Sequence, residues 1–599
     1  MRRIVRAVSD DAGPAPIACM ARSHESEQAT ASCGSIATMY KLKSMFGPIF
    51  NRKTLRDDAV AGLVLGVESV PDGLAGGLLA GVNPVFGLYG YMVGTVTGAL
   101  FTSAAFMAVQ ATGAMAIVVS DVSAVHTGDD PERALFTLAM LTGVVMLVAG
   151  LLKLGSLLRW VSNAVLVGFI NAVGVNIVLG QLDNFSGYEA DGANRITRAF
   201  DLLFNIFQAH WPSMIIGTVT IALIVVLERT RLGPLGMVAA IVVTSAAVVL
   251  FGLDNVAQLR DITDVPRSLP LPRFPDLRLI PTLTIPALSL AFVGLVQGAG
   301  ISANFPNPDG DYPDASQDFV GQGAANIASG ILQGMPVGGS MSASSLVKTA
   351  GAKSKGALVI AGGVMAAIVL VLGDIVGYIA MPALAGLLML VGYRTVKPAD
   401  IVAVWKTGLS QATVMTVTFV LTMLIPLQYA VIVGVGIAVI LFVMNQSNRI
   451  TLRRWLVRED GRLRETDAPA VVGENEVIVL QPYGSLFFAS APVFEEELPE
   501  VTTHTDHSVV ILRLRGKGDL GSTFMEVLSR YSTNLMQANS KLVLVYSDAR
   551  VRDQLRVTGV LDLLTEDNVY ESDEWLGATV ARAHEDATKW IQNRIDDED

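Results

Sequence analysis

The chain has 599 residues, of which 51% are hydrophobic and only 16% are charged. Soluble globular proteins carry about 25% charged residues, so this composition indicates a membrane protein. The formal net charge of −11 argues against a nucleic-acid-binding protein, because binding phosphates requires a basic surface.

The residues of common metal centres and ATP-driven motors are missing from the apolar part of the chain. Cys19 and Cys33 precede the first apolar segment, and the six histidines lie outside the apolar stretches. This pattern offers no disulfide framework and no zinc or haem ligand spacing. The sequence contains no G-x-x-x-x-G-K-[ST] motif and no nucleophile–base arrangement. We therefore expect a membrane protein that does not carry its own energy source and is not an enzyme, with no metal site and no cofactor.

The N-terminal residues 1–38 are polar and lack the apolar core of a signal peptide. We predict that residues 1–50 form a disordered, cytoplasmic segment, with Met1 and Met39 both open as the start of translation.

Apolar runs follow one another from about Asp58 to Asn445 and predict a membrane domain over 51–446. A bilayer core of about 30 Å needs about 20 residues per helix. Fourteen segments result, and Gly62-x-x-x-Gly66 in the first predicts close helix packing. The segments are 59–80, 84–104, 111–125, 133–153, 161–182, 213–228, 233–253, 287–303, 319–333, 341–351, 356–373, 375–393, 411–426 and 428–446.

The charge pattern predicts the orientation of these segments. Lys and Arg gather before the first segment, in the even-numbered loops and after the last segment, whereas short odd-numbered loops such as 129–132 are neutral or acidic. Cytoplasmic loops carry the excess of Lys and Arg. We therefore expect a multi-pass protein of the plasma (inner) membrane with both termini in the cytoplasm.

Two segments, the third (111–125) and the tenth (341–351), are short, and each is third in a set of seven. Each follows small residues or helix breakers, at 102–105 and 334–340. Such segments at matching places in two halves indicate a substrate site between inverted repeats. Two half-helices would then face each other in mid-membrane, and their N-terminal N–H groups and dipoles favour an anion. The alternative interpretation is that the two short segments are ordinary tilted or re-entrant helices.

The composition changes after Asn445. Residues 447–473 form a charged linker in this interpretation, and 474–599 read as a small α/β domain. Short β-branched runs at 477–480, 509–512 and 542–545 predict buried strands. Helical patterns lie at about 490–499, 522–538, 550–564 and 573–594.

Several motifs, in the expected order, resemble the SulP family of anion transporters over about residues 50–595. They are Val70–Ala75, Leu79–Tyr89, Gly321–Ala328, Met335–Ser342 and Leu512–Leu528. The resemblance implies a polytopic α-helical membrane protein with fourteen spans as 7+7 inverted repeats, divided into core and gate domains. It also implies a cytoplasmic α/β STAS domain at 474–599, alternating access and a homodimer.

The resemblance also implies where the anion binds. The positions that match the family's pocket are Ala111, Thr112, Gly113, Gln297, Ser340, Ser342, Ala343 and Ser344. Ala343 stands where the family often has Arg, and Gln297 stands where an acidic residue is common. The anion would therefore be held by helix dipoles, backbone N–H groups and hydroxyls.

Asp72 stands where the first helix of the family often has Gln. An ionisable residue deep in a span is a candidate functional group. We predict that Asp72 couples transport by binding H⁺ or Na⁺, and that Glu68, one turn earlier, shares this role. The alternative for Asp72 is that it lies at a hydrated helix end. The alternative for Glu68 is that it is a neighbouring side chain that extends to the membrane interface.

Ser522 and Thr523 match positions where bacterial STAS domains can be phosphorylated. The helix dipole favours a phosphate at a helix start. However, this chain has Gly521 at the preceding position, where those bacterial domains usually have an aspartate. These two residues are regulatory candidates, and a plain N-cap is the alternative.

The predicted function is secondary-active transport of a small inorganic anion, sulfate first and bicarbonate next. Chloride, a dicarboxylate, an uncoupled channel or exchanger, a nucleobase permease and a signalling protein remain alternatives. Expected partners are the anion, the lipid bilayer, a second copy of the chain and an unidentified protein bound by the STAS domain, but no nucleic acid.

Overall fold

The computed structural model describes residues 54–598 apart from 156–161, 193, 264, 266, 427–428, 431–432, 434–435, 438, 442, 445–449, 458–461, 487, 515–517, 519, 573–574 and 576. The N-terminal segment 1–50, with both cysteines and Met39, lies outside the described residues. The chain divides into two compact units, residues 1–435 and 436–599.

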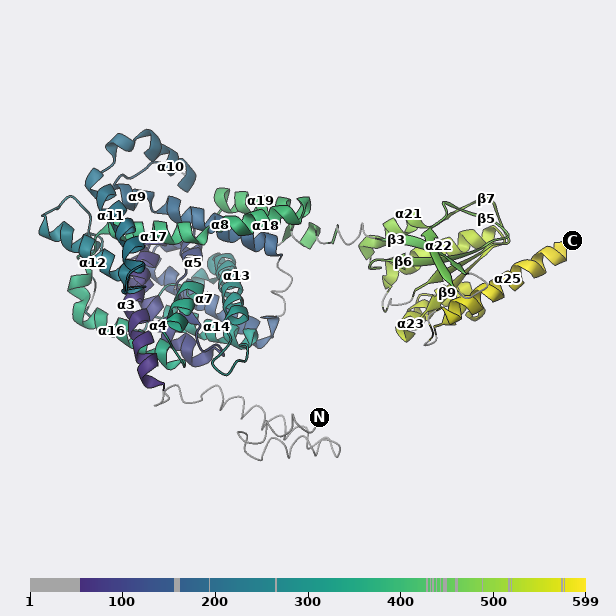
Figure 1. Cartoon of the computed structure of the whole chain (residues 1–599), viewed down its shortest axis with the longest axis horizontal. Helices are drawn as coiled ribbons and strands as arrows, with labels where there is room; N and C mark the ends of the chain where they lie inside the picture. Colours follow the sequence, from purple (N-terminus) through teal and green to yellow (C-terminus); the bar gives the residue numbers. More distant parts are fainter. Residues whose placement is uncertain are drawn as a thin grey trace, which may run out of the picture. The chain divides into compact units, whose positions relative to one another are not determined.

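The first unit is helical (Figure 1). Among the described residues, seven helices are long and apolar enough to cross a membrane, and α12 (Leu235–Leu250) and α19 (Leu409–Leu424) are shorter apolar helices. Each of the first thirteen predicted segments corresponds mainly to one helix, whereas the fourteenth, 428–446, lies in a stretch described only in part. The matching helices are α3 (Leu55–Leu79), α4 (Pro84–Phe101), α5 (Gly113–Ser120), α7 (Pro131–Leu151), α8 (Asn163–Gly180), α11 (Trp211–Glu228), α12 (Leu235–Leu250), α13 (Ile280–Asn304), α14 (Ala315–Ile331), α15 (Met341–Thr349), α16 (Gly356–Val376), α17 (Met381–Thr395) and α19 (Leu409–Leu424).

These helices pack in two groups. The core group contains α3, α4, α5, α7, α13, α14, α15 and α16, and the gate group contains α8, α11, α12, α17 and α19. Equivalent segments of the two sets of seven make equivalent contacts. In the core group, the first segment (α3) packs on the eleventh (α16), and the eighth (α13) packs on the fourth (α7) in the same way. In the gate group, the fifth (α8) packs on the thirteenth (α19), and the twelfth (α17) packs on the sixth (α11). This repetition confirms the predicted helical membrane fold with a core and a gate.

Short elements join some of the long helices. They are α6 (Ala124–Thr127), α9 (Leu182–Ser186), α10 (Arg195–Phe204), η2 (Ile206–Gln208), η3 (Leu259–Asp261), η4 (Leu277–Leu279) and α18 (Pro398–Thr407).

The second unit is an α/β domain, as predicted. Its six-stranded sheet has the order β10-β9-β8-β6-β3-β4, and β5 pairs with β7 in a separate two-stranded sheet. The strands are β3 (Thr451–Val457), β4 (Leu463–Asp467), β5 (Val471–Glu474), β6 (Val477–Tyr483), β7 (Glu500–Asp506), β8 (Val509–Arg513), β9 (Lys541–Tyr546) and β10 (Val569–Glu571). The pairs among β6, β8, β9 and β10 are parallel, and β3 and β4 add antiparallel strands at one side.

Helices cover both faces of this sheet. One face packs on α25 (Ala578–Glu598). The other packs on α21 (Ala491–Glu497), α22 (Gly521–Gln537), α23 (Ala549–Val557) and α24 (Val560–Leu564). The predicted helix over 550–564 is split into α23 and α24 by Gly559, whose φ is +76°.

The charged linker predicted at 447–473 needs correction, because it contains β3, β4 and most of β5. These strands escaped prediction because they lie toward the edge of the sheet or outside it. Arg453, Arg454 and Glu465 lie on β3 and β4, where ion pairs replace the apolar run expected of a central strand.

The α3–α16 contact depends on two glycines. A Cβ on Gly62 would lie 2.5 Å from the carbonyl oxygen of Ala357, and a Cβ on Gly66 would lie 2.8 Å from that of Ala361. Because backbone atoms cannot move aside cheaply, only glycine allows this approach.

Gly62→Ala should therefore destabilise the protein by about 1–3 kcal/mol, the usual cost of overpacking. The matched control is Gly363→Ala on α16, where an added Cβ meets no atom within 4 Å. Thermal unfolding of the purified full chain in detergent measures both. Equal melting temperatures for the two variants would contradict the packing argument.

Candidate functional site

Two three-residue strands form the centre of the core group. β1 (Ala108–Gln110) pairs with β2 (Gly338–Ser340) in antiparallel register, with Val109 opposite Gly339. All six residues are buried. β1 leads into α5 and β2 leads directly into α15, so the two short helices run in opposite directions and both N-termini point back toward the strand pair. We call this arrangement the strand-helix junction.

Side chains from neighbouring helices accept hydrogen bonds from backbone N–H groups in and beside the strand pair. The Ala108 N–H donates to Ser344 Oγ at 3.0 Å, and the Gly339 N–H donates to Gln322 Oε1 at 3.0 Å. The Val337 N–H, just before β2, donates to Asn326 Oδ1 at 2.9 Å. Such contacts are required because irregular backbone at membrane depth has no water to bind. Ser344, predicted to bind the anion, is fully buried and supports β1.

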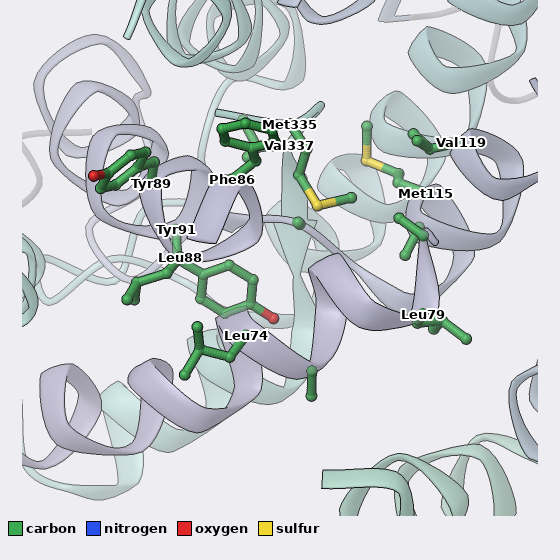
Figure 2. Packing of buried hydrophobic residues seen from close by; sticks show 14 of the residues in the cluster. Leu74, Leu79, Phe86, Leu88, Tyr89, Tyr91, Met115, Val119, Met335 and Val337 are labelled. Carbon is green, nitrogen blue, oxygen red and sulfur yellow. The ribbon is translucent and has the colours of Figure 1, made fainter. Parts of the chain in front are cut away.

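Apolar residues from four segments surround the junction (Figure 2). They are Leu74 and Leu79 of α3, Phe86, Leu88 and Tyr91 of α4, Met115 and Val119 of α5, and Met335 and Val337 before β2.

On the α5 side, Thr112 is the N-cap residue. Its Oγ1 accepts the Met115 N–H at 3.4 Å and donates to Gln297 Oε1 of α13 at 2.9 Å. Within the described part of the chain, Gln297 Nε2 has no hydrogen-bond partner. Gly113, the first helical residue, is half-buried, and Ala111 is buried. The predicted residues Ala111, Thr112, Gly113 and Gln297 therefore lie together.

On the α15 side, Ser340 is the N-cap residue. Its Oγ accepts the Ala343 N–H at 3.4 Å and lies 3.2 Å from Ser342 Oγ, which is exposed. Ala343 is buried and brings no charge to the helix start. Ser340, Ser342 and Ala343 thus line the opposite end of the strand pair.

Asp72 lies on α3 close to this junction. The Tyr91 hydroxyl of α4 donates to Asp72 Oδ2 at 2.7 Å. A Cβ built on Gly76, one turn after Asp72, would lie 3.8 Å from the Ala111 carbonyl oxygen and 3.9 Å from the Tyr91 ring. Glu68, one turn before Asp72, is half-buried on the same helix.

The sequence analysis did not single out Tyr91, although a tyrosine inside an apolar helix needs a hydrogen-bond partner for its hydroxyl. It also overlooked the buried Gln110, whose Nε2 donates to Ser69 Oγ at 2.9 Å. The available signals were a tyrosine within an apolar helix and a glutamine in the apolar stretch just before the third segment.

Two buried carboxylates hold the loops next to the short helices. Asp318 of α14 accepts hydrogen bonds of 2.6–3.1 Å from Ser103, Ala104 and Ser302, and Asp58 of α3 accepts bonds of 2.7–2.9 Å from Lys353 and Ser354. Residues 103–104 precede β1, and residues 353–354 follow α15. These carboxylates are therefore clamps on both broken segments.

One contact joins the core group to the connection between α8 and α11 in the gate group. Arg195 of α10 donates to Asp121 Oδ1 at 2.9 Å and to Ser120 Oγ at 2.5 Å. Ser120 and Asp121 end α5. The pair is mostly shielded from solvent, with exposed side-chain fractions of 23% and 15%.

In the second unit, Ser522 and Thr523 lie exposed in the first turn of α22. The N-cap position belongs to Leu520, and no side chain caps this helix. The N-cap alternative for these two hydroxyls is therefore wrong. Among the described residues of both units, no group of three or more His, Cys, Asp or Glu side chains could hold a metal ion.

Comparisons with known proteins cover most of the chain. A model of the sulfate permease family matches residues 55–418, and a STAS domain model matches residues 468–583. The chain is 24% identical over 532 residues to a protein of Bacillus subtilis (strain 168) described as the putative sulfate transporter YvdB, covering 87% of this chain and 97% of that protein.

Solved structures show the same fold. The murine solute carrier 26 family member A9 anion transporter in the inward-facing state aligns with a TM-score of 0.80 at 19% identity, covering 93% of this chain and 95% of that one. The transmembrane domain of the cyanobacterial bicarbonate transporter BicA aligns with a TM-score of 0.55 at 20% identity, covering 65% and 98%. Since one family model spans α3 to α19 and a second spans most of the α/β unit, the chain belongs to the sulfate permease family and carries a STAS domain.

Proposed function

We propose that the chain transports a small inorganic anion across the membrane by secondary-active transport, with sulfate as the first candidate and bicarbonate as the next. Membership of the sulfate permease family supports anion transport. The observation that carries the proposal is the strand-helix junction, where two helix N-termini point toward one short strand pair.

The junction can attract an anion without a fixed cation at Ala343. Each helix N-terminus is equivalent to about half a positive charge. A three-residue strand is about 10 Å long, so an anion midway lies about 5 Å from each end. At an effective dielectric of about 20, the two ends together contribute roughly 3 kcal/mol, similar to one full charge at this distance. The Ser342 hydroxyl and Gln297 Nε2 would supply further donors.

Asp72 is the proposed coupling residue, with H⁺ or Na⁺ as the bound ion and Glu68 in support. A carboxylate near an anion site repels the anion unless it is neutralised. Neutralisation by a cation would therefore favour entry of both ions together. The Tyr91 hydroxyl donates a hydrogen bond to Asp72, but the proposed role depends on the charge of the carboxylate and not on this bond.

Alternating access would proceed by movement of the core group against the gate group. The Arg195–Asp121 contact joins the two groups at the end of α5, so this movement would have to break it. We propose further that the protein lies in the plasma membrane with cytoplasmic termini, forms a homodimer and is regulated through its STAS domain.

Uptake of radiolabelled sulfate into proteoliposomes containing the full chain tests the function. We expect accumulation above equilibrium when a pH or Na⁺ gradient is imposed, and competition by the true substrate among bicarbonate, chloride and fumarate. Flux that only equilibrates under every gradient would favour the uncoupled channel or exchanger. No flux of any of these anions would contradict the proposal.

Asp72→Asn should abolish the dependence of uptake on the imposed gradient, because the amide can neither bind a proton nor neutralise a cation. Asp57→Asn is the matched control, since Asp57 is an exposed carboxylate on the same helix. Tyr91→Phe keeps the charge of Asp72 and should keep the gradient dependence. An unchanged dependence in Asp72→Asn would remove Asp72 from the mechanism.

Cross-linking between core and gate should stop transport. In a Cys19→Ser, Cys33→Ser background, the pair Asp121→Cys and Arg195→Cys joined by a short bifunctional thiol reagent should lower uptake at least tenfold, with recovery after reduction. The control pair, Asp183→Cys and Arg198→Cys, joins α9 to α10 on the gate side alone, where the native side chains lie 3.8 Å apart. Full cross-linking of the first pair with normal uptake would exclude separation at this contact.

A further inference from the structure

The connection between α8 and α11 contains a strongly amphipathic helix. Along α10 and η2, Ile196, Phe200, Leu203, Phe204 and Phe207 recur every three or four residues and therefore share one face. The last four have exposed fractions of 56%, 64%, 81% and 88%. An exposed apolar patch of this kind marks a contact surface.

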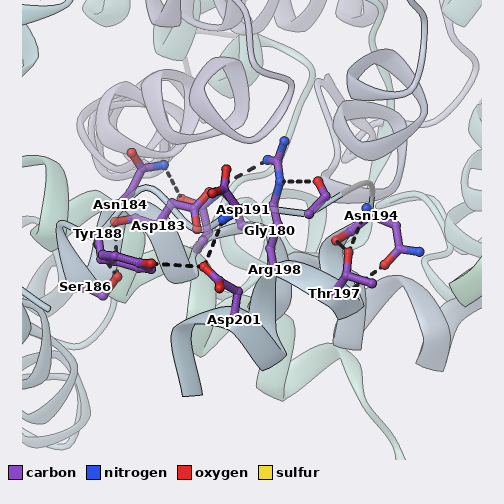
Figure 3. Close-up of polar contacts among 12 residues, drawn as sticks. Gly180, Asp183, Asn184, Ser186, Tyr188, Asp191, Asn194, Thr197, Arg198 and Asp201 are labelled. Carbon is purple, nitrogen blue, oxygen red and sulfur yellow. Dashed lines mark hydrogen bonds and ion pairs between the residues drawn. The ribbon is translucent and has the colours of Figure 1, made fainter. Parts of the chain in front are cut away.

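The opposite face of α10 is fixed by polar contacts (Figure 3). Tyr188 Oη donates to Asp201 Oδ2 at 3.1 Å, and Arg198 lies 3.8 Å from Asp183. Asn194 and Thr197 form a capping box at the helix start, and Leu202 is buried. Because these contacts fix the rotation of the helix, the phenylalanines cannot turn inward.

The chain continues from the exposed patch into the candidate membrane span α11, which also exposes apolar side chains. η2 is followed by Trp211, which is 54% exposed and begins the span α11. Along α11, Ile215, Val219 and Val226 are 58%, 42% and 59% exposed. Tryptophan at a helix end is typical of the membrane interface. The apolar face of α10 and η2 therefore leads along the chain into an exposed apolar side of α11, at the end of that span where Trp211 lies.

From this continuity we infer that α10 and η2 form an interfacial helix, with Phe200, Leu203, Phe204 and Phe207 inserted among the lipid chains of the leaflet where α8 ends and α11 begins. The partner is a lipid surface, because the exposed side chains at these positions are apolar and flexible acyl chains fit a convex helix face. This inference does not depend on the transported anion.

Spin-label accessibility in the full chain tests the inference. In the Cys19→Ser, Cys33→Ser background, single cysteines replace Leu203, Phe204 or Phe207, and the labelled protein is reconstituted in phosphatidylcholine nanodiscs. At all three positions the collision rate with oxygen should exceed that with a water-soluble nickel chelate at least threefold. The control is Val557→Cys, an apolar residue of α23 that is 86% exposed. There, the nickel chelate should be at least as accessible as oxygen.

Ratios at 203, 204 and 207 equal to that at 557 would place α10 in water and overturn the inference. Exclusion of both reagents together with spin–spin broadening would identify a second copy of the chain as the occupant and would also overturn it. Exposed positions are chosen so that the label does not disturb packing. A label at the buried position Leu202 checks that α10 keeps its rotation. This label should be inaccessible to both reagents and should show no spin–spin broadening.

Discussion

The need to satisfy every backbone polar group within the membrane governs this structure. Two spans stop being helical near the middle of the core group, and each places a three-residue strand where its helix is broken. Neither strand could remain there alone, because unpaired N–H and C=O groups cost several kcal/mol each in hydrocarbon. Each strand is the other's partner, so a segment of the first repeat and one of the second form a single unit.

Several polar residues follow from this constraint. Ser344, Gln322 and Asn326 bind backbone groups in or beside the strands. Asp318 holds the loop before β1, and Asp58 holds the loop after α15. The default interpretation of a carboxylate in a membrane segment is a functional site. Here Asp58 and Asp318 each accept three hydrogen bonds from loop residues, and Asp318 accepts a fourth from Ser302 of α13, which is a structural role. Asp72, with one bond from Tyr91, lies in a different environment.

The sequence predicted the membrane fold well because apolar length is a direct physical requirement of a bilayer. The signal of continuous β-branched runs located the central strands β6, β8 and β9 for a similar reason, since these strands are buried on both faces. It missed β3 and β4, whose arginines and glutamate pair at the edge of the sheet. The resemblance brought Thr112 and Gln297 to the same site, but not the support of β1 by Ser344. That role depends on a contact between residues 236 positions apart, which no local pattern records.

The pairing of β1 with β2 would have a kinetic consequence for the proposed transport mechanism. The two helix starts, with their N-cap hydroxyls of Thr112 and Ser340, are joined through the strand pair, so in that mechanism they would move together with the anion. Desolvation of the anion would then occur once on entry and be reversed once on release, rather than at successive points along a pore. The sliding of apolar helix surfaces would set the height of the barrier to translocation, and the junction would set ion selectivity. Under this proposal, changes to the sliding helix surfaces should leave ion selectivity intact.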